Sequence, residues 1–159
     1  MKKGLLGVIA ITFLCTVLFL PANAKAETQH DMMNMGPMST LTVDGYILNY
    51  SVQTADEHKK MMTDMKIDPA KMKMTPQATH FFSLEMKGTD GKVVDNAVVR
   101  VKIIDPDQKD QIQWAEFLKE MNHYSCDFNM QKKGKYGVIV LFKTADEKKH
   151  IAKFWHELK

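Results

Sequence analysis

Turn signals at intervals of about ten residues are the feature that most constrains the fold of this chain. Across Thr79–Phe142, stretches of alternating apolar and polar residues end at Gly88–Gly91, at Asp105–Asp107 and at Gly134–Lys135. Alternation places every second side chain on one face of a strand, and connections this short join antiparallel neighbours. Together with an earlier alternating stretch at Tyr46–Val52, the pattern predicts an all-β domain, an antiparallel β-sandwich.

Two segments, residues 111–121 and 147–158, fit a helix by periodicity alone. The residues spaced as helical stripes are Trp114, Phe117, Leu118 and Met121 in the first, and Ile151, Phe154, Trp155 and Leu158 in the second. Both segments border strong strands through short connections, and a sandwich needs a closing strand. We therefore predict strands for both, with the helical alternative open.

The first 26 residues have the features of a secretory signal peptide. Lys2 and Lys3 precede an uncharged apolar run at Gly4–Leu20, and small residues at Ala22, Ala24 and Ala26 provide a cleavage site. The rival interpretation, a retained membrane anchor, is disfavoured by the proline that breaks the run before the alanines. We expect a periplasmic or secreted protein with no membrane span after cleavage.

Cleavage after Ala26 removes three lysines and no acidic residue, so the 22 basic residues fall to 19 and equal the 19 acidic ones. A formally neutral chain has no electrostatic footprint for nucleic acid or an anionic membrane. Cys126 is then the one remaining cysteine and has no partner for an internal disulfide. We expect it to be a buried small hydrophobe, with a metal-binding thiolate as the alternative.

Methionine is concentrated near the start of the mature chain: nine of 13 lie between Met32 and Met74. Residues 27–40 are polar or flexible apart from their thioethers and are predicted to form a disordered Met-rich arm. The domain is then 41–159, with an insertion at about 54–77, where Thr54–Glu57 matches a helix capping box. On that helix, His58 shares one face with Met61, Met62 and Met65.

Thioether sulfur is soft, neutral and not consumed by disulfide formation, so methionine clusters in an exported protein suit copper, above all Cu(I). Histidine nitrogen would add affinity for Cu(II). The candidate metal ligands are His30, Met32, Met33, Met35, Met38, His58, Met61, Met62, Met65, Met72, Met74 and His80. The flexible spacing suits capture and transfer to a copper-accepting or other envelope protein, not catalysis, and no haem, nucleophile-elbow, phosphate-loop or zinc-protease motif is present.

Other interpretations stay open. Met61, Met62 and Met65 also have the spacing of a stripe packed on the sandwich, and His80 has the position of an ordinary strand residue. His123 beside Met121 is a candidate for a second, smaller site. The rival function is a non-metal interaction module of the cell envelope that uses the Met-rich helix as an adaptable docking surface.

Several segments resemble the YtkA-like group of small exported bacterial proteins. They are Gly45–Tyr50, Ala78–Phe82, Thr89–Asp95 and Lys133–Val140, within a likeness that runs from Gly45 to the C-terminus. The resemblance implies an immunoglobulin-like antiparallel β-sandwich of about seven strands, a terminal strand, and a Met-rich helical or loop insertion after the first strand. Some members lie near copper-handling or respiratory-oxidase assembly genes. Where relatives carry paired histidines, this chain has His80 followed by phenylalanine.

Overall fold

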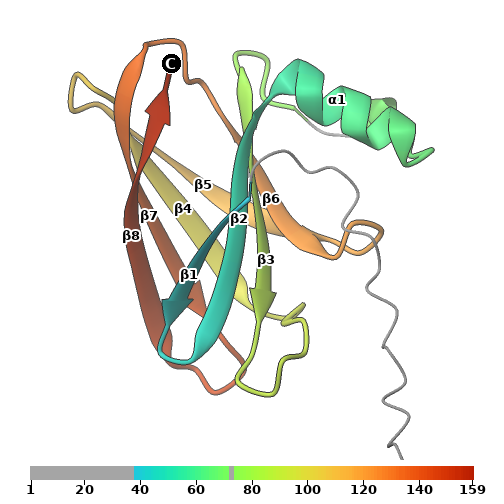
Figure 1. The fold of residues 1–159 in the computed structure, drawn as a ribbon, viewed down its shortest axis with the longest axis vertical. Coiled ribbons are helices and arrows are strands. Elements are labelled where there is room, and N and C mark those ends of the chain that lie inside the picture. Colours follow the sequence, from blue (N-terminus) through green and yellow to red (C-terminus); the bar gives the residue numbers. More distant parts are fainter. Residues whose placement is uncertain (1–37, 72–73) are drawn as a thin grey trace, which may run out of the picture. The chain divides into compact units, whose positions relative to one another are not determined.

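A computed structural model describes residues 38–71 and 74–159 (Figure 1). The predicted signal peptide, 1–26, and all but the last residues of the predicted arm lie outside these ranges. The elements are β1 (Ser39–Val43), β2 (Tyr46–Thr54), α1 (Ala55–Asp64), the 3-10 turn η1 (Pro69–Lys71), β3 (His80–Lys87), β4 (Val98–Ile104), β5 (Asp110–Leu118), β6 (His123–Phe128), β7 (Gly134–Lys143) and β8 (Lys149–Leu158).

The strands run in the order β1-β2-β3-β6-β5-β4-β7-β8, and every neighbouring pair is antiparallel. β5 joins the two layers of the sandwich, because residues 110–115 pair with β4 whereas residues 116–118 pair with β6. β1 and β8 lie in contact at the two ends of this order without pairing. The result is an all-β, nearly closed sandwich (Figure 1).

Alternate residues of the strands supply the core between the layers, to which β1 and β5 contribute only partly buried side chains. Its fully buried members include Phe82, Leu84, Met86, Val101, Ile103, Val138, Val140 and Phe142. Cys126 belongs to the same core, and burial raises the pKa of its thiol. The expectation that Cys126 is buried is confirmed.

The two segments with helical periodicity are strands, β5 and β8. On β5, Ala115 and Phe117 pack against the core while Ile112 and Trp114 are exposed. The side chains of β5 thus alternate with a period of two, as they must in a strand that pairs with β4 and β6. Strand pairing here outweighs the local helical spacing.

The strand count and the place of the insertion differ from the prediction. The described residues form eight strands instead of about seven, because Ser39–Val43 is an additional edge strand, β1. It returns to β2 through Asp44 and Gly45, both with positive φ. The helical insertion therefore follows the second strand, not the first. A five-residue edge strand with only two large apolar residues carries too weak a pattern to be identified from sequence.

The insertion begins as the capping box predicts. Thr54 Oγ1 accepts a hydrogen bond from the backbone N–H of Glu57 at 3.2 Å, and the Glu57 carboxylate accepts one from the backbone N–H of Thr54 at 2.8 Å. α1 lies beside β2 and β3, away from β7 and β8 (Figure 1). Within the described ranges no helix is long and apolar enough to cross a membrane.

Candidate metal-binding site

The outer faces of β2, β3 and β6 carry buried polar residues instead of the exposed ones usual there. One cross-strand row consists of Ser51, Ser83 and Ser125, which are directly paired neighbours and all buried. The next row contains Gln53, Phe81 and Asp127. His123 precedes Ser125 by two residues on β6 and so lies on the same face, on the other side of the serine row.

Helix α1 packs against the β2 and β3 part of this face. The His58 ring stacks on the Phe81 ring, with centroids 4.3 Å apart and planes within 11° of parallel. One turn further along, Met61 and Met62 are only 6% and 4% exposed. None of these four side chains belongs to the core between the two layers of strands. They form a second buried layer between helix and sheet, which we call the α1 layer.

The hydrogen bonds of the two histidines determine which ring nitrogen is free. His123 Nδ1 lies 3.1 Å from the backbone carbonyl oxygen of Met121, and His58 Nδ1 lies 3.4 Å from Gln53 Oε1. Both oxygens only accept, so each Nδ1 carries the hydrogen and each neutral ring has its lone pair on Nε2. Both Nε2 atoms are buried without a hydrogen-bond partner. Metal-binding histidines have this arrangement, with Nδ1–H held by an oxygen and Nε2 directed to the ion.

Burial keeps both rings neutral. It lowers the pKa of His58 to about 4, with a further contribution from the positive charge that His123 would carry nearby. Burial also lowers the pKa of His123, opposed by its bond to the Met121 carbonyl and by the Glu85 carboxylate. A neutral imidazole keeps its lone pair for a metal even in mildly acidic surroundings.

The serine row adds three more unpartnered polar atoms. Among the residues that the structure describes, seven buried side-chain nitrogen or oxygen atoms lack a hydrogen-bond partner. Five lie in or under the α1 layer: the Oγ atoms of Ser51, Ser83 and Ser125, and the Nε2 atoms of His58 and His123. A buried unpaired polar group costs about 1–3 kcal/mol, and native proteins hold few of them. Their concentration on and beside one sheet face makes this face the candidate binding site.

Apart from His80, the predicted ligands divide into three groups. The structure brings His58, Met61 and Met62 together in the α1 layer, where Met65 is the half-buried C-cap residue of the helix. Met38 and Met74 are described and half-buried, without a placement in this layer. The remaining candidates, His30, Met32, Met33, Met35 and Met72, lie outside the described residues.

His80 lies apart from the α1 layer. It shares the face of β3 that carries Phe82 and Leu84, opposite to Phe81. Its Nδ1 lies 2.9 Å from Thr79 Oγ1, and burial, followed by the nearby His156, lowers its pKa against an opposing effect of Glu57. This agrees with the alternative interpretation of His80 as a strand residue.

His123 lies on the same sheet face as the serine row, and the sequence did not group it with the helix. Sequence alone associates it with Met121, and the contact is real, but it is made by the Met121 backbone carbonyl and not by the thioether. The available signal was alternation: His123, Ser125 and Asp127 are polar, whereas Tyr124, Cys126 and Phe128 between them are core residues. A strand that is polar on one face and buried on both faces must pack its polar face against groups that can hydrogen-bond to it.

No group of three or more His, Cys, Asp or Glu side chains is positioned to hold a metal within residues 38–71 and 74–159. A metal in the α1 layer would therefore use two imidazoles together with thioether sulfur. The two carboxylates on this face are already engaged: Asp127 accepts hydrogen bonds from the Thr75 backbone N–H and hydroxyl, and Glu85 accepts one from Asn49 at 2.8 Å. The donor set is soft and neutral.

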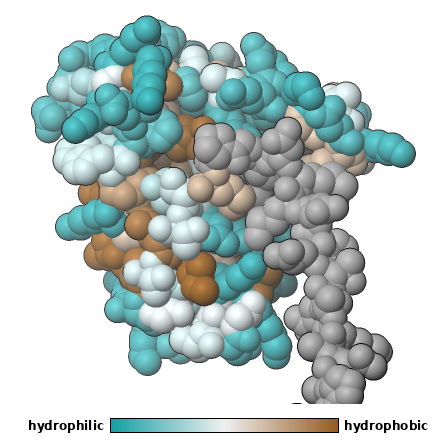
Figure 2. All heavy atoms as spheres, in the orientation of Figure 1, coloured by the Kyte–Doolittle hydropathy of each residue, from teal (hydrophilic) through white to brown (hydrophobic). Residues whose placement is uncertain are grey.

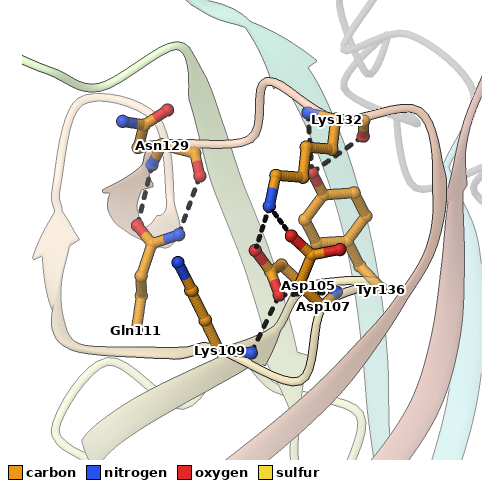
Figure 3. A network of polar contacts seen from close by, with 7 residues as sticks. All are labelled: Asp105, Asp107, Lys109, Gln111, Asn129, Lys132 and Tyr136. Atoms are coloured by element: carbon orange, nitrogen blue, oxygen red, sulfur yellow. Dashed lines mark hydrogen bonds and ion pairs between the residues drawn. The ribbon is translucent and has the colours of Figure 1, made fainter.

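A second polar region closes one end of the sandwich, around a hollow of about 510 Å³ (Figure 3). Gln111 exchanges two hydrogen bonds with the Asn129 backbone, at 2.7 and 2.9 Å. Lys132 contacts both Asp105 and Asp107, and its carbonyl accepts from the Tyr136 hydroxyl at 2.8 Å. These groups satisfy one another and tie the β4–β5 turn to the β6–β7 connection, so we assign the region a structural role.

Fold and site together define a small β-sandwich with a helix-covered polar face. No protein-family profile and no curated protein matches the sequence. The structure is similar to that of a DUF4426 family protein from Pseudomonas aeruginosa PAO1, with a TM-score of 0.56 at 13% identity, covering 76% of this chain and 94% of that one. It is also similar to FetP of uropathogenic E. coli strain F11, recombinantly expressed in the periplasm, with a TM-score of 0.54 at 10% identity, covering 76% and 92%. Likeness at this identity shows the β-rich fold alone.

Proposed function

We propose that this is an exported protein that binds copper, or a similarly soft ion, through His58 Nε2, His123 Nε2 and thioether sulfur of Met61 and Met62. One observation carries the proposal. Two buried imidazoles on this side of the sheet each turn Nδ1 to an oxygen and leave Nε2 unpartnered, and the helix that carries His58 also buries Met61 and Met62. Each ring is held at Nδ1 in the way that metal-binding histidines are.

The neutrality of the α1 layer favours a singly charged soft ion. Moving a charge into a buried layer is costly unless ligands compensate it, and the cost rises with the charge of the ion. Neutral imidazole nitrogen and thioether sulfur match Cu(I), whereas hard divalent ions prefer carboxylate oxygen, and the carboxylates of this face, Asp127 and Glu85, are held by Thr75 and Asn49. The serine hydroxyls beneath would hydrogen-bond to a water or small co-ligand on the ion.

The role we propose is capture and transfer, not catalysis. In this scheme the Met-rich arm, residues 27–40, collects the ion through flexible thioethers, and the α1 layer holds it for a copper-accepting envelope protein. The signal-peptide pattern supports export, and the YtkA-like resemblance supports a copper-related setting. The rival, a Met-rich docking surface, loses support because Met61 and Met62 are buried and unavailable to a partner.

The test is a Cu(I) titration of the mature protein against a chromophoric competing chelator. The double variant His58→Gln/His123→Gln should bind about a hundredfold more weakly or worse, and Met61→Leu/Met62→Leu at least about tenfold more weakly. Matched controls carry the same substitutions elsewhere: His150→Gln, at a histidine paired with Asp44 at 2.7 Å, and Met86→Leu in the core.

Circular dichroism of each variant confirms that it is folded. Unchanged Cu(I) affinity in folded His58→Gln/His123→Gln protein would show that His58 and His123 do not bind the ion. No competition by the wild-type protein at all would favour the interaction module instead.

A further inference from the structure

The outer face formed by β4, β5, β7 and β8 leaves large apolar side chains in solvent. Both tryptophans of the chain lie on it, Trp114 at 62% and Trp155 at 71% exposure. Ile112, Ile151 and Val98 are each about half exposed on the same face. In the view of Figure 2, hydrophobic residues reach the surface along the side where β8 lies, between hydrophilic ones. We call this surface the tryptophan face.

Strand register shows that these residues are contiguous. Trp114 pairs with Arg100, Arg100 with Leu141, and Leu141 with Ile151, which makes one row across four strands. The adjacent row is Ile112, Lys102, Ile139 and Lys153. Trp155 pairs with Gly137, where an added Cβ would come within 3.5 Å of the indole, so the ring lies close over the sheet.

Basic side chains are interleaved with the apolar ones. Alternation places six basic residues, Arg100, Lys102, Lys135, Lys143, Lys149 and Lys153, on this face against three acidic ones, Asp110, Glu116 and Glu157. Lys102 pairs with Asp110 at 2.5 Å, and Lys143 with Glu147 of the following turn at 2.5 Å. Arg100 lies 5.6 Å from the centre of the Trp114 ring, and Lys135, Lys149 and Lys153 have no ion-pair partner in the described part of the chain.

We propose that the tryptophan face docks the protein peripherally on the anionic phospholipid surface of an envelope membrane. Indole rings partition to the headgroup level, where their apolar bodies are buried and their N–H groups stay hydrated. Lysine and arginine between them meet anionic headgroups, each contributing about fivefold to partitioning near the surface. The basic excess is local, because the mature chain is formally neutral as a whole.

The composition of the face selects this occupant over the alternatives. A second copy of the chain would bring one basic face against another, which charge repulsion opposes. An uncharged partner would leave the unpaired lysines without counter-charge. A bilayer offers negative charge and an apolar interior together, at the depth where tryptophan is most stable.

The test uses co-sedimentation of the mature protein with vesicles of phosphatidylcholine alone or mixed with phosphatidylglycerol, and tryptophan fluorescence as a second readout. Binding is expected only with phosphatidylglycerol, with a blue shift of the emission and weakening by added salt. Lys149→Glu/Lys153→Glu should lower the partition coefficient more than tenfold. Lys59→Glu/Lys66→Glu, on the exposed side of α1 and the turn after it, makes the same change in net charge and should leave binding unchanged.

Trp114→Ser/Trp155→Ser should also lose the partitioning while staying folded, because both side chains are exposed. Equal losses in the two charge-reversal variants would overturn the proposal, since net charge and not this face would then control binding. Binding no stronger to phosphatidylglycerol than to phosphatidylcholine would overturn it as well. An acidic protein would then be the alternative partner for this face.

Discussion

The two outer faces of the sandwich invert the usual distribution of polarity. On β2, β3 and β6 the outward residues include serine, glutamine and histidine, yet they are buried, and α1 packs against β2 and β3. On β4, β5, β7 and β8 the outward residues include tryptophan and isoleucine, yet they are exposed. Buried polar groups and exposed apolar patches are the two departures that mark functional surfaces. This small domain therefore has two separate surfaces to explain, one that encloses polar side chains and one that exposes apolar ones.

Truncating an aromatic side chain should therefore destabilise the protein on the covered face and leave its stability unchanged on the exposed face. This is the largest contrast that we expect in the free energy of unfolding. Phe81 is 4% exposed and carries the His58 ring, so Phe81→Ala should lower the free energy of unfolding by about 3 kcal/mol. Trp155→Ser should change it by no more than about 0.5 kcal/mol, because most of the indole is already in water. Urea unfolding of both variants measures the contrast, and similar losses would mean that the tryptophan face is covered in solution.

Acidification should also act through the covered face. The pKa of His58 is about 4 when folded and about 6.5 when unfolded, so between these values the unfolded state binds more protons. Stability should be full above pH 6.5 and fall by about 3 kcal/mol as the pH drops to 4. His58→Phe, which keeps the stacking on Phe81, should remove this contribution from the metal-free protein. An unchanged pH profile in that variant would show that His58 is not held in a proton-free environment.

The serine row gives a smaller effect of opposite sign. Ser83 is buried and its hydroxyl has no partner, so Ser83→Ala should stabilise the metal-free protein by about 1 kcal/mol. The same change at Ser39, which is exposed on β1, should have no such effect. Thermal unfolding compares the two, and destabilisation by Ser83→Ala would show that this hydroxyl is hydrogen-bonded in solution.

Two copies of one tetrapeptide show how far local sequence carries the fold. Thr54–Glu57 and Thr144–Glu147 are both Thr-Ala-Asp-Glu, and both satisfy the capping-box pattern. The first begins α1, whereas the second is a tight turn in which Glu147 has positive φ and its N–H bonds the Thr144 carbonyl at 2.9 Å. The residues after the second copy form β8, which pairs with β7 along its whole length. This pairing outweighs the local preference of the capping-box sequence to begin a helix.

Alternation and turn signals predicted the all-β class and the terminal strands, because each strand must bury one face in the core. The spacing of Met61, Met62 and Met65 allowed for a helix packed on the sandwich, and Met61 and Met62 are buried, but nothing local records which strands the helix packs against. The sequence therefore did not group His58 with His123, which is 65 positions further along the chain. Net charge likewise concealed the tryptophan face, because neutrality of the whole chain allows a basic excess on one side.

The most direct test of the copper account is X-ray absorption at the copper edge on Cu(I)-loaded mature protein in which Met32, Met33, Met35 and Met38 are replaced by leucine. With the arm unable to contribute sulfur, the account predicts full loading and a coordination shell of both imidazole nitrogen and thioether sulfur. The nitrogen contribution should disappear in the same protein carrying His58→Gln/His123→Gln. A failure of the arm variant to load, or a shell without imidazole nitrogen, would contradict a metal site between α1 and the sheet.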